Sequence, residues 1–420
     1  MATASGIEKK VILAPQAAQG TVAVAALATA RYLRRVTASF ALSKETFQSN
    51  EMRADRQIGD MRHGIQLYDG TISGELSPLT YSLLMAGILR KVWVAAAAGG
   101  ADIDVAAAVT TGNSGTFTSA ATATFITDGL KVGDVIRWTG WTTTGAGNND
   151  RNFLITALTE LIMTGTMLDG SPVIAKIAGD SVTPTGIGFK LWTPALAHTE
   201  DWFSIEEYFS DLDLSEVTWD MKPNTMAIKL PASGMATIDF GMMGLSQNRL
   251  VAGTSPYFTS VVAATTTGIL AAVNGAVYVA GTKIAVITGL DFDVAAGLTS
   301  EGVVGSNVRP DLFDGRIQVK GNVSCFFESA TMRDYFVDET EVSIICAFTE
   351  GTGVAATDGV MSFVMPRVKM GGYSRDDGEK GIIQTMPFVA LFNTAGDDGT
   401  TCTVNSLATT LSIQDSDVIT

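Results

Sequence analysis

The sequence predicts a mostly β protein with antiparallel sheets, and three observations support this prediction. Gly, Val and Thr are abundant, with 43 Gly among 420 residues, and only 17% of the residues are charged. Short runs alternate apolar and polar side chains, which is the pattern of a strand with one buried face. Turn residues at 223–224 and 231–234 separate successive runs. β-Branched residues in alternation favour strands, so we expect sheets to dominate the fold.

Length and charge limit the possible classes. A chain of 420 residues predicts two or three domains, and 46% hydrophobic residues are enough for sizeable cores. The net charge of −15 argues against a groove that binds nucleic acid, because phosphate binding depends on Lys and Arg. An acidic surface would still let DNA pass without adhering to it. The chain has three cysteines, of which Cys325 and Cys346 are expected to be buried thiols. Because the number with Cys402 is odd, no disulfide framework is implied. A reducing folding compartment fits this pattern.

The sequence predicts neither a membrane anchor nor a cleaved secretion signal. The longest uncharged stretch, Leu250–Thr282, is interrupted by Pro256, several Gly and many Thr. Lys9 and Lys10 beside an Ala-rich run resemble the start of a signal, but Glu8 and later polar residues interrupt the apolar core that a signal needs.

The N-terminal part of the chain is predicted to contain an arm, two strands and a charged loop. Residues 1–30 are rich in Ala, Gly and Thr, so we expect an extended arm that frays or lies against a neighbour. Residues 36–42 alternate apolar and polar side chains, which predicts a strand. The charged run Lys44–His63 is predicted to be a loop, and the alternating run Gly64–Glu75 a second strand.

A short helix is predicted directly after this second strand. Ser77 suits its N-cap and Pro78 its first turn. One apolar face follows at the spacing i, i+3, i+4, i+7, formed by Tyr81, Leu84, Met85 and Ile88. The loop, strand and helix together predict an assembly unit, in which the loop reaches outward while the strand and helix anchor it.

The same pattern returns 251 residues later, which we interpret as an internal duplication. Glycine and serine positions of the first strand then coincide with Gly315, Gly321 and Ser324. The helix face coincides with Met332, Tyr335 and Phe336, and a second loop-like run, Thr299–Asp314, precedes the second copy. The alternative is a chance alignment of residues that are common in β proteins. A true repeat would mean two related half-folds in one subunit.

Residues 95–195 are predicted to form a small β-sandwich or barrel inserted into a surface loop. The composition changes after Leu89, and 94–124 are almost without charge. Short strands are predicted within Gly129–Trp141 and Asn149–Leu158, and at Met163–Leu168 and Pro172–Ile177. Such insertions cost little folding free energy, because loop-closure entropy grows slowly with loop length.

The main fold is predicted to resume at Glu200–Gly244 as an antiparallel meander. Three runs alternate apolar with polar or acidic side chains: Val217–Met221, Met226–Leu230 and Ala236–Phe240. The breaks between them, at 223–224 and 231–234, carry turn residues. One face of this meander is apolar and the other polar.

These motifs resemble the tail tube (major tail) proteins of long-tailed, siphovirus-type bacteriophages. The resemblance is carried by RADRQIGDMRHG followed by YDGTISGELSPLTYSLLM, by the meander from FSIEEYF to DFGMMG, and by GLKVGDVIRWTG in the insert. Outside the insert it covers roughly 30–92 and 197–395. It implies a tail-tube-type antiparallel β-sandwich or barrel with a short flanking helix and an inserted small β-domain.

The predicted organisation follows from this resemblance. We expect an N-terminal arm at 1–30, a discontinuous and duplicated tail tube domain at 31–94 and 196–395, the insert at 95–195 on the outside of the tube, and a C-terminal arm or strand at 396–420. In the family that the chain resembles, six subunits close into a ring around a continuous inner barrel, and stacked rings form a hollow tube for the genome. The terminal segments are then expected to act as stacking arms.

The resemblance also implies partners and a location. We expect further copies of the chain, the tape measure, tail terminator and baseplate or tip proteins of the tail, and viral DNA that passes through the lumen without sequence-specific binding. The protein would be made in the host bacterial cytoplasm and reside in the virion. An acidic lumen would let a polyanion slide; the alternative is that acidic residues keep an abundant protein soluble.

The candidate contact residues lie in the charged loop, which the resemblance implies to be an inter-subunit or inter-ring contact. They are Arg53, Asp55, Arg56, Asp60 and Arg62. Because both signs are mixed, this set favours salt bridges to a neighbouring ring over phosphate binding. The alternative is a mobile surface loop.

No set of residues predicts catalysis, a cofactor or a metal. The two histidines, His63 and His198, lie far apart in sequence, and the usual zinc, nucleophile-elbow and P-loop motifs are absent. The run at 351–356 resembles a dinucleotide fingerprint but lacks a following helix, so a turn is expected. A cluster of four acidic residues lacks the spacing of a calcium-binding loop. We predict that it lies in a solvated or interface loop; its members are Glu206, Glu207, Asp211 and Asp213.

Other functions stay open from the sequence. The chain could form the inner tube of a contractile injection machine. It could also be a bacterial surface binding protein with the insert as its ligand domain, which a processed signal peptide would favour. An enzyme is disfavoured, because no nucleophile and base occur together.

Overall fold

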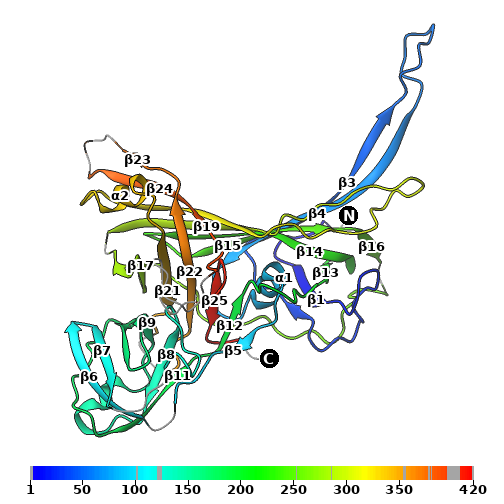
Figure 1. The fold of residues 1–420 in the computed structure, drawn as a ribbon. Helices are drawn as coiled ribbons and strands as arrows, with labels where there is room; N and C mark the ends of the chain where they lie inside the picture. The colour runs from blue at the N-terminus through cyan, green and yellow to red at the C-terminus, as the bar shows by residue number, and fades with distance from the viewer. Residues whose placement is uncertain are drawn as a thin grey trace.

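The computed structural model describes residues 3–100, 103–120, 125–251, 253–284, 286–352, 356–376, 379, 381–394 and 407–418. The fold is mostly β and antiparallel, with short helices and a small closed barrel (Figure 1). The predicted fold class is therefore confirmed.

The central sheet contains seven strands, which follow one another from early to late parts of the chain except that β15 precedes β14. From its free edge the order is β3 (Thr37–Gln48), β4 (Met61–Glu75), β15 (Thr237–Gly244), β14 (Leu214–Pro231), β19 (Ile287–Ala295), β20 (Gln318–Phe326) and β24 (Ile383–Ala390). At the far edge, β24 also pairs with β23 (Ser374–Arg375) and with the end of β22 (Val360–Met370).

Two smaller sheets continue from this central sheet. One contains β17 (Gly275–Val279), its hairpin partner β18 (Thr282–Lys283), β21 (Val342–Thr349), β22, β25 (Ser412–Asp415), β12 (Phe189–Trp192) and β5 (Val94–Ala95). The other contains β2 (Arg31–Tyr32), β1 (Lys9–Pro15), β13 (Phe203–Phe209), the first half of β14 and β16 (Ser246–Leu250).

The core lies on one face of the central sheet, under which α1 (Ser82–Leu89) packs (Figure 1). From α1, Leu84, Met85 and Ile88 are buried, as the helical spacing predicts. The sheet supplies alternating apolar side chains that are fully or almost fully buried: Ile72, Ile238, Phe240, Met226, Ile228, Phe292, Val294, Val319, Val323, Met386 and Phe388. The register places all of these on one face, so the other face of the sheet is left to polar residues.

The helix begins later than predicted. Instead of capping the helix, the Ser77 hydroxyl hydrogen-bonds to the Thr80 hydroxyl at 2.7 Å. Leu79 adopts a left-handed backbone with φ 65°, and its N–H donates to the Asp415 carboxylate at 2.8 Å. A right-handed helix cannot include such a residue, so α1 starts only at Ser82. The contact with Asp415, far away in the sequence, therefore outweighs the local capping signal.

The meander also differs from the prediction. Two of its expected strands are one strand, β14, and no turn occurs at 223–224. There the register shifts, and β14 exchanges its partners. Residues up to Met221 pair with β13 and β16, residues from Lys222 pair with β15, and residues from Thr225 pair with β19 as well. Pro223 and Asn224 thus mark a change of sheet rather than a change of direction.

The N-terminal segment is not an arm throughout. Lys9–Pro15 forms β1, which pairs along its whole length with β13 of the same chain. Ile12, Leu13 and Ala14 are buried, so apolar burial fixes this strand within the subunit. At the other end, the described residues 407–418 include β25, which lies between β12 and β22.

Residues of the predicted insert form a closed barrel in the order β10-β7-β6-β11-β8-β9. The strands are β6 (Ile103–Thr111), β7 (Ser114–Ser119), β8 (Val135–Thr139), β9 (Phe153–Leu158), β10 (Ile162–Met167) and β11 (Ser181–Gly186), with a 3-10 helix at Thr143–Asn148. The sequence did not predict β6 and β7. The strand predicted at 172–177 is wrong: this segment forms only an isolated bridge between Lys176 and Ala107. The domain boundaries at 95 and 195 remain a prediction.

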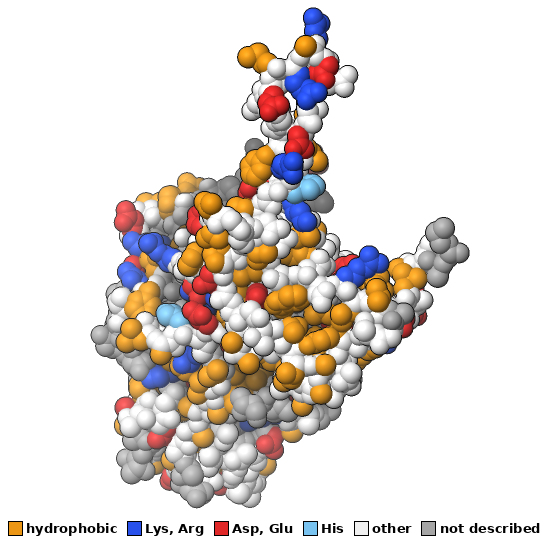
Figure 2. Space-filling model, turned by 90° about the vertical axis from the view of Figure 1, so that its right-hand side faces the viewer, with side chains coloured by type: hydrophobic (Ala, Val, Ile, Leu, Met, Phe, Trp, Pro, Cys, Tyr) orange, Lys and Arg blue, Asp and Glu red, His pale blue; other side chains and the backbone are white. Residues whose placement is uncertain are grey.

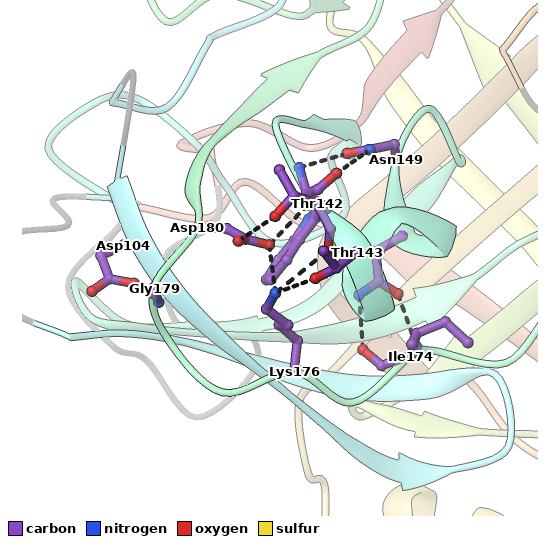
Figure 3. Close-up of polar contacts among 10 residues, drawn as sticks. Asp104, Thr142, Thr143, Asn149, Ile174, Lys176, Gly179 and Asp180 are labelled. Carbon is purple, nitrogen blue, oxygen red and sulfur yellow. Dashed lines mark hydrogen bonds and ion pairs between the residues drawn. The ribbon is translucent and has the colours of Figure 1, made fainter.

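A polar network holds one side of the barrel together (Figure 3). The Asp180 carboxylate accepts the N–H and hydroxyl of Thr142 at 2.8 and 2.7 Å, and Lys176 lies 3.1 Å from it. The bonds from Thr142 hold the pKa of Asp180 below its usual value. Asn148 exchanges two hydrogen bonds with Ile174. These contacts connect the 3-10 helix to the segment before β11, so that the segment needs no strand pairing to stay in place.

The barrel core continues into the main fold. Trp138, Phe117 and Phe153 of the barrel belong to the same buried cluster as Tyr278 and Ile345, which lie on β17 and β21. Gln414 of β25 reinforces this junction from the other side. Its side chain accepts the Val135 N–H and donates to the carbonyls of Val135 and Ile187, all at 2.8 Å.

The two predicted buried thiols are confirmed. Cys325 and Cys346 are buried and free, and burial raises the pKa of both, that of Cys346 to about 12. Cys402 lies outside the described residues.

The Gln414 junction gives a first prediction. Gln414→Ala removes three buried hydrogen bonds and should lower the free energy of unfolding by about 2–4 kcal/mol, measured by urea denaturation. The control is Gln318→Ala on the solvent face of β20, which should stay within about 0.5 kcal/mol of the parent. An equal effect of both substitutions would contradict this account of the junction.

Asp415 gives a prediction for pH dependence. Burial raises the pKa of its carboxyl from 3.8 to about 7. Between these two values the folded chain binds a proton that the unfolded chain does not bind, so stability falls as the pH rises through this window and then levels off. Asp415→Asn should remove this part of the slope. Urea denaturation between pH 5 and pH 8 measures it, and identical slopes for the variant and the parent would refute the assignment.

Candidate assembly surfaces

A long two-stranded hairpin projects from the central sheet (Figures 1 and 2). Strands β3 and β4 remain paired as far as Gln48 and Met61, so only Ser49–Asp60 is the connection. The predicted loop at 44–63 was therefore too long at both ends. Residues 41–48 and 50–63 are all exposed, on both faces of the ribbon. Such a ribbon has no buried face, and hence no core-facing alternation from which its strands could be recognised.

The structure brings the five candidate contact residues together at the hairpin tip. Arg53 pairs with Asp55 at 3.0 Å, and Arg62 pairs with Asp60 at 2.7 Å. Arg56 lies in the turn between them with φ 56°. The bond from Arg53 lowers the pKa of the Asp55 carboxyl. These are local pairs between near neighbours in the sequence, and their part in contacts between subunits stays a prediction.

Apolar side chains accompany these charges, and the sequence prediction did not single them out. Phe47 and Ile58 are 58% and 67% exposed, and Met52 is fully exposed. Exposure of large apolar side chains to water is unfavourable. Such side chains on a projecting ribbon are therefore typical of a surface that a partner covers. The available signal was the presence of Met and Ile inside an otherwise charged run.

A second loop lies against the base of the hairpin. The Gln66 N–H donates to the Asn307 carbonyl at 2.8 Å, and Gln66 forms a parallel bridge with Val308. The loop ends at Asp314, which pairs with Arg90 at 3.4 Å and with Lys222 at 3.5 Å. This is the predicted loop 299–314 of the second copy, and the two loop regions lie side by side.

The two proposed copies do share an order of elements. β4 is followed by α1, and β20 by α2 (Thr331–Val337). Gly70 and Gly321, which correspond at the offset of 251, are both covered by a phenylalanine, since an added Cβ would meet Phe40 or Phe388. The helices differ, because Phe336 of α2 is exposed. The duplication remains an interpretation.

The outward face of the central sheet carries small and polar side chains in continuous rows. One row crosses all seven strands through Thr37, Ser73, Asp239, Ala227, Asp293, Lys320 and Val389. The next row contains Glu75, Thr237, Lys229, Asp291, Asn322 and Pro387. We call this surface the polar face.

The polar face is acidic. The side chains on this face include the carboxylates of Asp69, Glu75, Asp239, Asp291 and Asp293, but only the ammonium groups of Lys229 and Lys320. Lys229 lies 3.3 Å from Asp239, and Asn322 donates to Asp291 at 2.8 Å. Excess negative charge therefore remains on this surface.

The central sheet has an unpaired edge. In the part of the chain that the structure describes, β3 pairs with β4 only, so its other side has no strand partner, although the Ala38 carbonyl accepts a hydrogen bond from Lys9. The opposite edge strand, β24, is covered by β22 and β23 over much of its length. An unpaired edge of this length is a template for pairing with another chain.

The described residues contain no group that could hold a metal ion. The four carboxylates considered in the sequence separate in the fold. Glu206 is buried and accepts bonds from the Ser215 hydroxyl and from the Tyr257 and Phe258 N–H groups, while Glu207, on the other side of β13, pairs with Lys9. Burial raises the pKa of Glu207. Strand alternation thus directs the two glutamates to opposite faces, and Glu206 is not part of a solvated loop.

The remaining sequence candidates are also accounted for. Gly351 follows β21 with φ 70° in the connection to β22, as predicted for a turn; 353–355 lie outside the described residues. His63 lies on β4, and His198 lies between β12 and β13. Among the described residues, no helix has the length and apolar character to span a membrane.

Comparison with known proteins agrees with the fold. A search of curated proteins gave no match. A family model described as phage tail tube protein matches residues 6–390, which is nearly the whole chain. The chain therefore belongs to the phage tail tube protein family, whose members are structural components of the virion.

Proposed function

We propose that this protein is the tail tube subunit of a siphovirus-type phage, that six copies close into a ring, and that rings stack into a tube with an acidic lumen for DNA. The observation that carries the proposal is the polar face, which lies on the sheet that also has an unpaired edge. A sheet with one apolar and one polar face needs water on the polar side. In a ring this water would be in the lumen.

The acidity of the polar face supports a role in conduction. DNA carries a dense negative charge, and proteins that hold it neutralise phosphates with Lys and Arg. The polar face has more carboxylates than ammonium groups, and one of its two lysines, Lys229, lies against Asp239, so it offers few such sites. Viral DNA would therefore pass along it without binding, in agreement with the net charge of −15.

The edge strand and the hairpin support self-assembly. An unpaired β3 can be completed by a neighbouring copy, and a repeated heterologous contact closes into a ring when its rotation permits. The number of six rests on the resemblance of the sequence to tail tube proteins. The hairpin, with its apolar and charged tip, would contact the neighbouring ring.

The proposal also assigns roles to the barrel and the terminal segments and names the partner proteins of the tail. The barrel would decorate the outside of the tube, and the terminal segments would assist stacking. The tape measure, terminator and tip proteins are the expected partners, and the free buried thiols fit synthesis in a bacterial cytoplasm. The inner tube of a contractile machine is the alternative within this class, and it would require an enclosing sheath.

Electron microscopy of the purified protein tests the proposal. Concentrated protein should form rings and hollow tubes with six subunits around the axis. Monomers that never associate at high concentration, or compact closed oligomers without a channel, would contradict it.

Shortening the hairpin separates folding from assembly. Replacing Ser49–Asp60 by Asn-Gly keeps the strands paired through a two-residue turn. Since the removed residues are nearly all exposed, the urea midpoint should not change, whereas tubes should no longer form. Sedimentation and microscopy measure the second effect. A variant that still forms tubes would show that the tip is not a ring contact.

Charge reversal on the polar face tests the lumen. Asp239→Lys, Asp291→Lys and Asp293→Lys together should give tubes that retain DNA in a salt-dependent manner during an ejection assay. The matched control changes three exposed acidic residues of the barrel region instead, Asp150, Glu160 and Asp169, and should leave ejection unchanged. Equal behaviour of the two variants would place the polar face outside the channel.

A further inference from the structure

An open groove lies beside β1 and β2, and its chemistry suits the hairpin tip. Its volume is about 590 Å³. Val11 and Leu33 form a buried apolar floor, and Ile7, which is 92% exposed, stands at its margin. Val261 also lines it. Such an open apolar surface is typical of a binding site for another protein.

The charges of the groove are all positive. Lys9, Lys10 and Arg35 line it, and no acidic residue does. Lys9 is neutralised by Glu207, and Arg35 donates to the Lys9 carbonyl. Lys10 is exposed above the ring of Tyr32, 5.9 Å from its centroid, and forms no ion pair with any described residue. An ammonium group is thus available to an incoming carboxylate.

The hairpin tip offers the complementary groups. Met52 is fully exposed, and Glu51 beside it forms no ion pair with any described residue. The other acidic residues of the tip, Asp55 and Asp60, are paired with Arg53 and Arg62. The unpaired carboxylate is therefore adjacent in sequence to the most exposed apolar side chain of the tip, and the unpaired ammonium group lines the same groove as the apolar floor.

The position of the two surfaces permits the contact. β1, β13 and β16 lie on the side of the molecule from which the hairpin rises (Figure 1). Seen from that side, hydrophobic side chains gather below the hairpin (Figure 2). Because the hairpin projects beyond the body of the subunit, its tip can reach this side of a neighbouring copy (Figure 1).

We propose that the groove receives the hairpin tip of a second copy, with Met52 on the apolar floor and Glu51 against Lys10. The proposal rests on the stacking described above and names the surface that stacking uses. Each contact buries two apolar surfaces that the isolated subunit leaves in water. It also pairs two charges that form no ion pair within the described chain.

Cysteine cross-linking tests the location. In a Cys402→Ser background, Met52→Cys with Ile7→Cys should yield a ladder of covalent oligomers after oxidation of assembled tubes, and none at a dilution where tubes dissociate. The control pairs Met52→Cys with Ile177→Cys, an equally exposed position on the barrel side, and should give no ladder. Tubes that form without the ladder would overturn the groove assignment but not the tube function, whereas failure of the parent protein to form tubes would count against the function itself.

Charge exchange tests the pairing. Lys10→Glu and Glu51→Lys should each raise the concentration needed for assembly several-fold, and the double variant should restore it, because the pair is then reversed rather than broken. Thermal melting of the dilute subunits should be unchanged in all three. A double variant that assembles no better than the single variants would refute the pairing.

Discussion

The fold depends on a constraint set by one strand. β14 has 18 residues. Its first part belongs to the small sheet around β1 and its second part to the central sheet. The exchange of partners between Met221 and Thr225 turns the chain from the small sheet around β1 to the central sheet. Both sheets therefore keep a fixed relation, and α1 can pack where they meet. The position of the groove relative to the central sheet follows from this continuity.

The sequence allowed the fold class and the family resemblance to be predicted, because alternating runs and their turn residues reflect burial directly. Elements that depend on distant contacts could not be predicted. Leu79 leaves the helix because its N–H binds Asp415, more than three hundred positions away. The continuation of β14 through Pro223 depends on partners far away in the sequence. β6 and β7, in a run of Ala, Thr and Gly, take their structure from barrel closure.

The candidate site was predictable only in part. The charged run identified the tip, and Arg53, Asp55, Asp60 and Arg62 do lie together there. The hairpin strands were missed because a ribbon exposed on both faces leaves no hydrophobic period. The alternation of polar side chains within single strands could be recognised in the sequence. The polar face itself could not be predicted, because its rows combine seven strands from four parts of the chain. Phe47, Met52 and Ile58 became informative only once their exposure was known.

The hairpin leaves the body in one direction only, which has a consequence for any stack of such subunits. A filament built by one repeated step has unlike ends, because only one of them bears hairpins that contact no further copy. Because the two ends of the filament differ, a different protein is needed to bind each of them. One such protein can start the growth of the filament and another can stop it. In this way copies of a single protein produce a filament with two distinguishable ends.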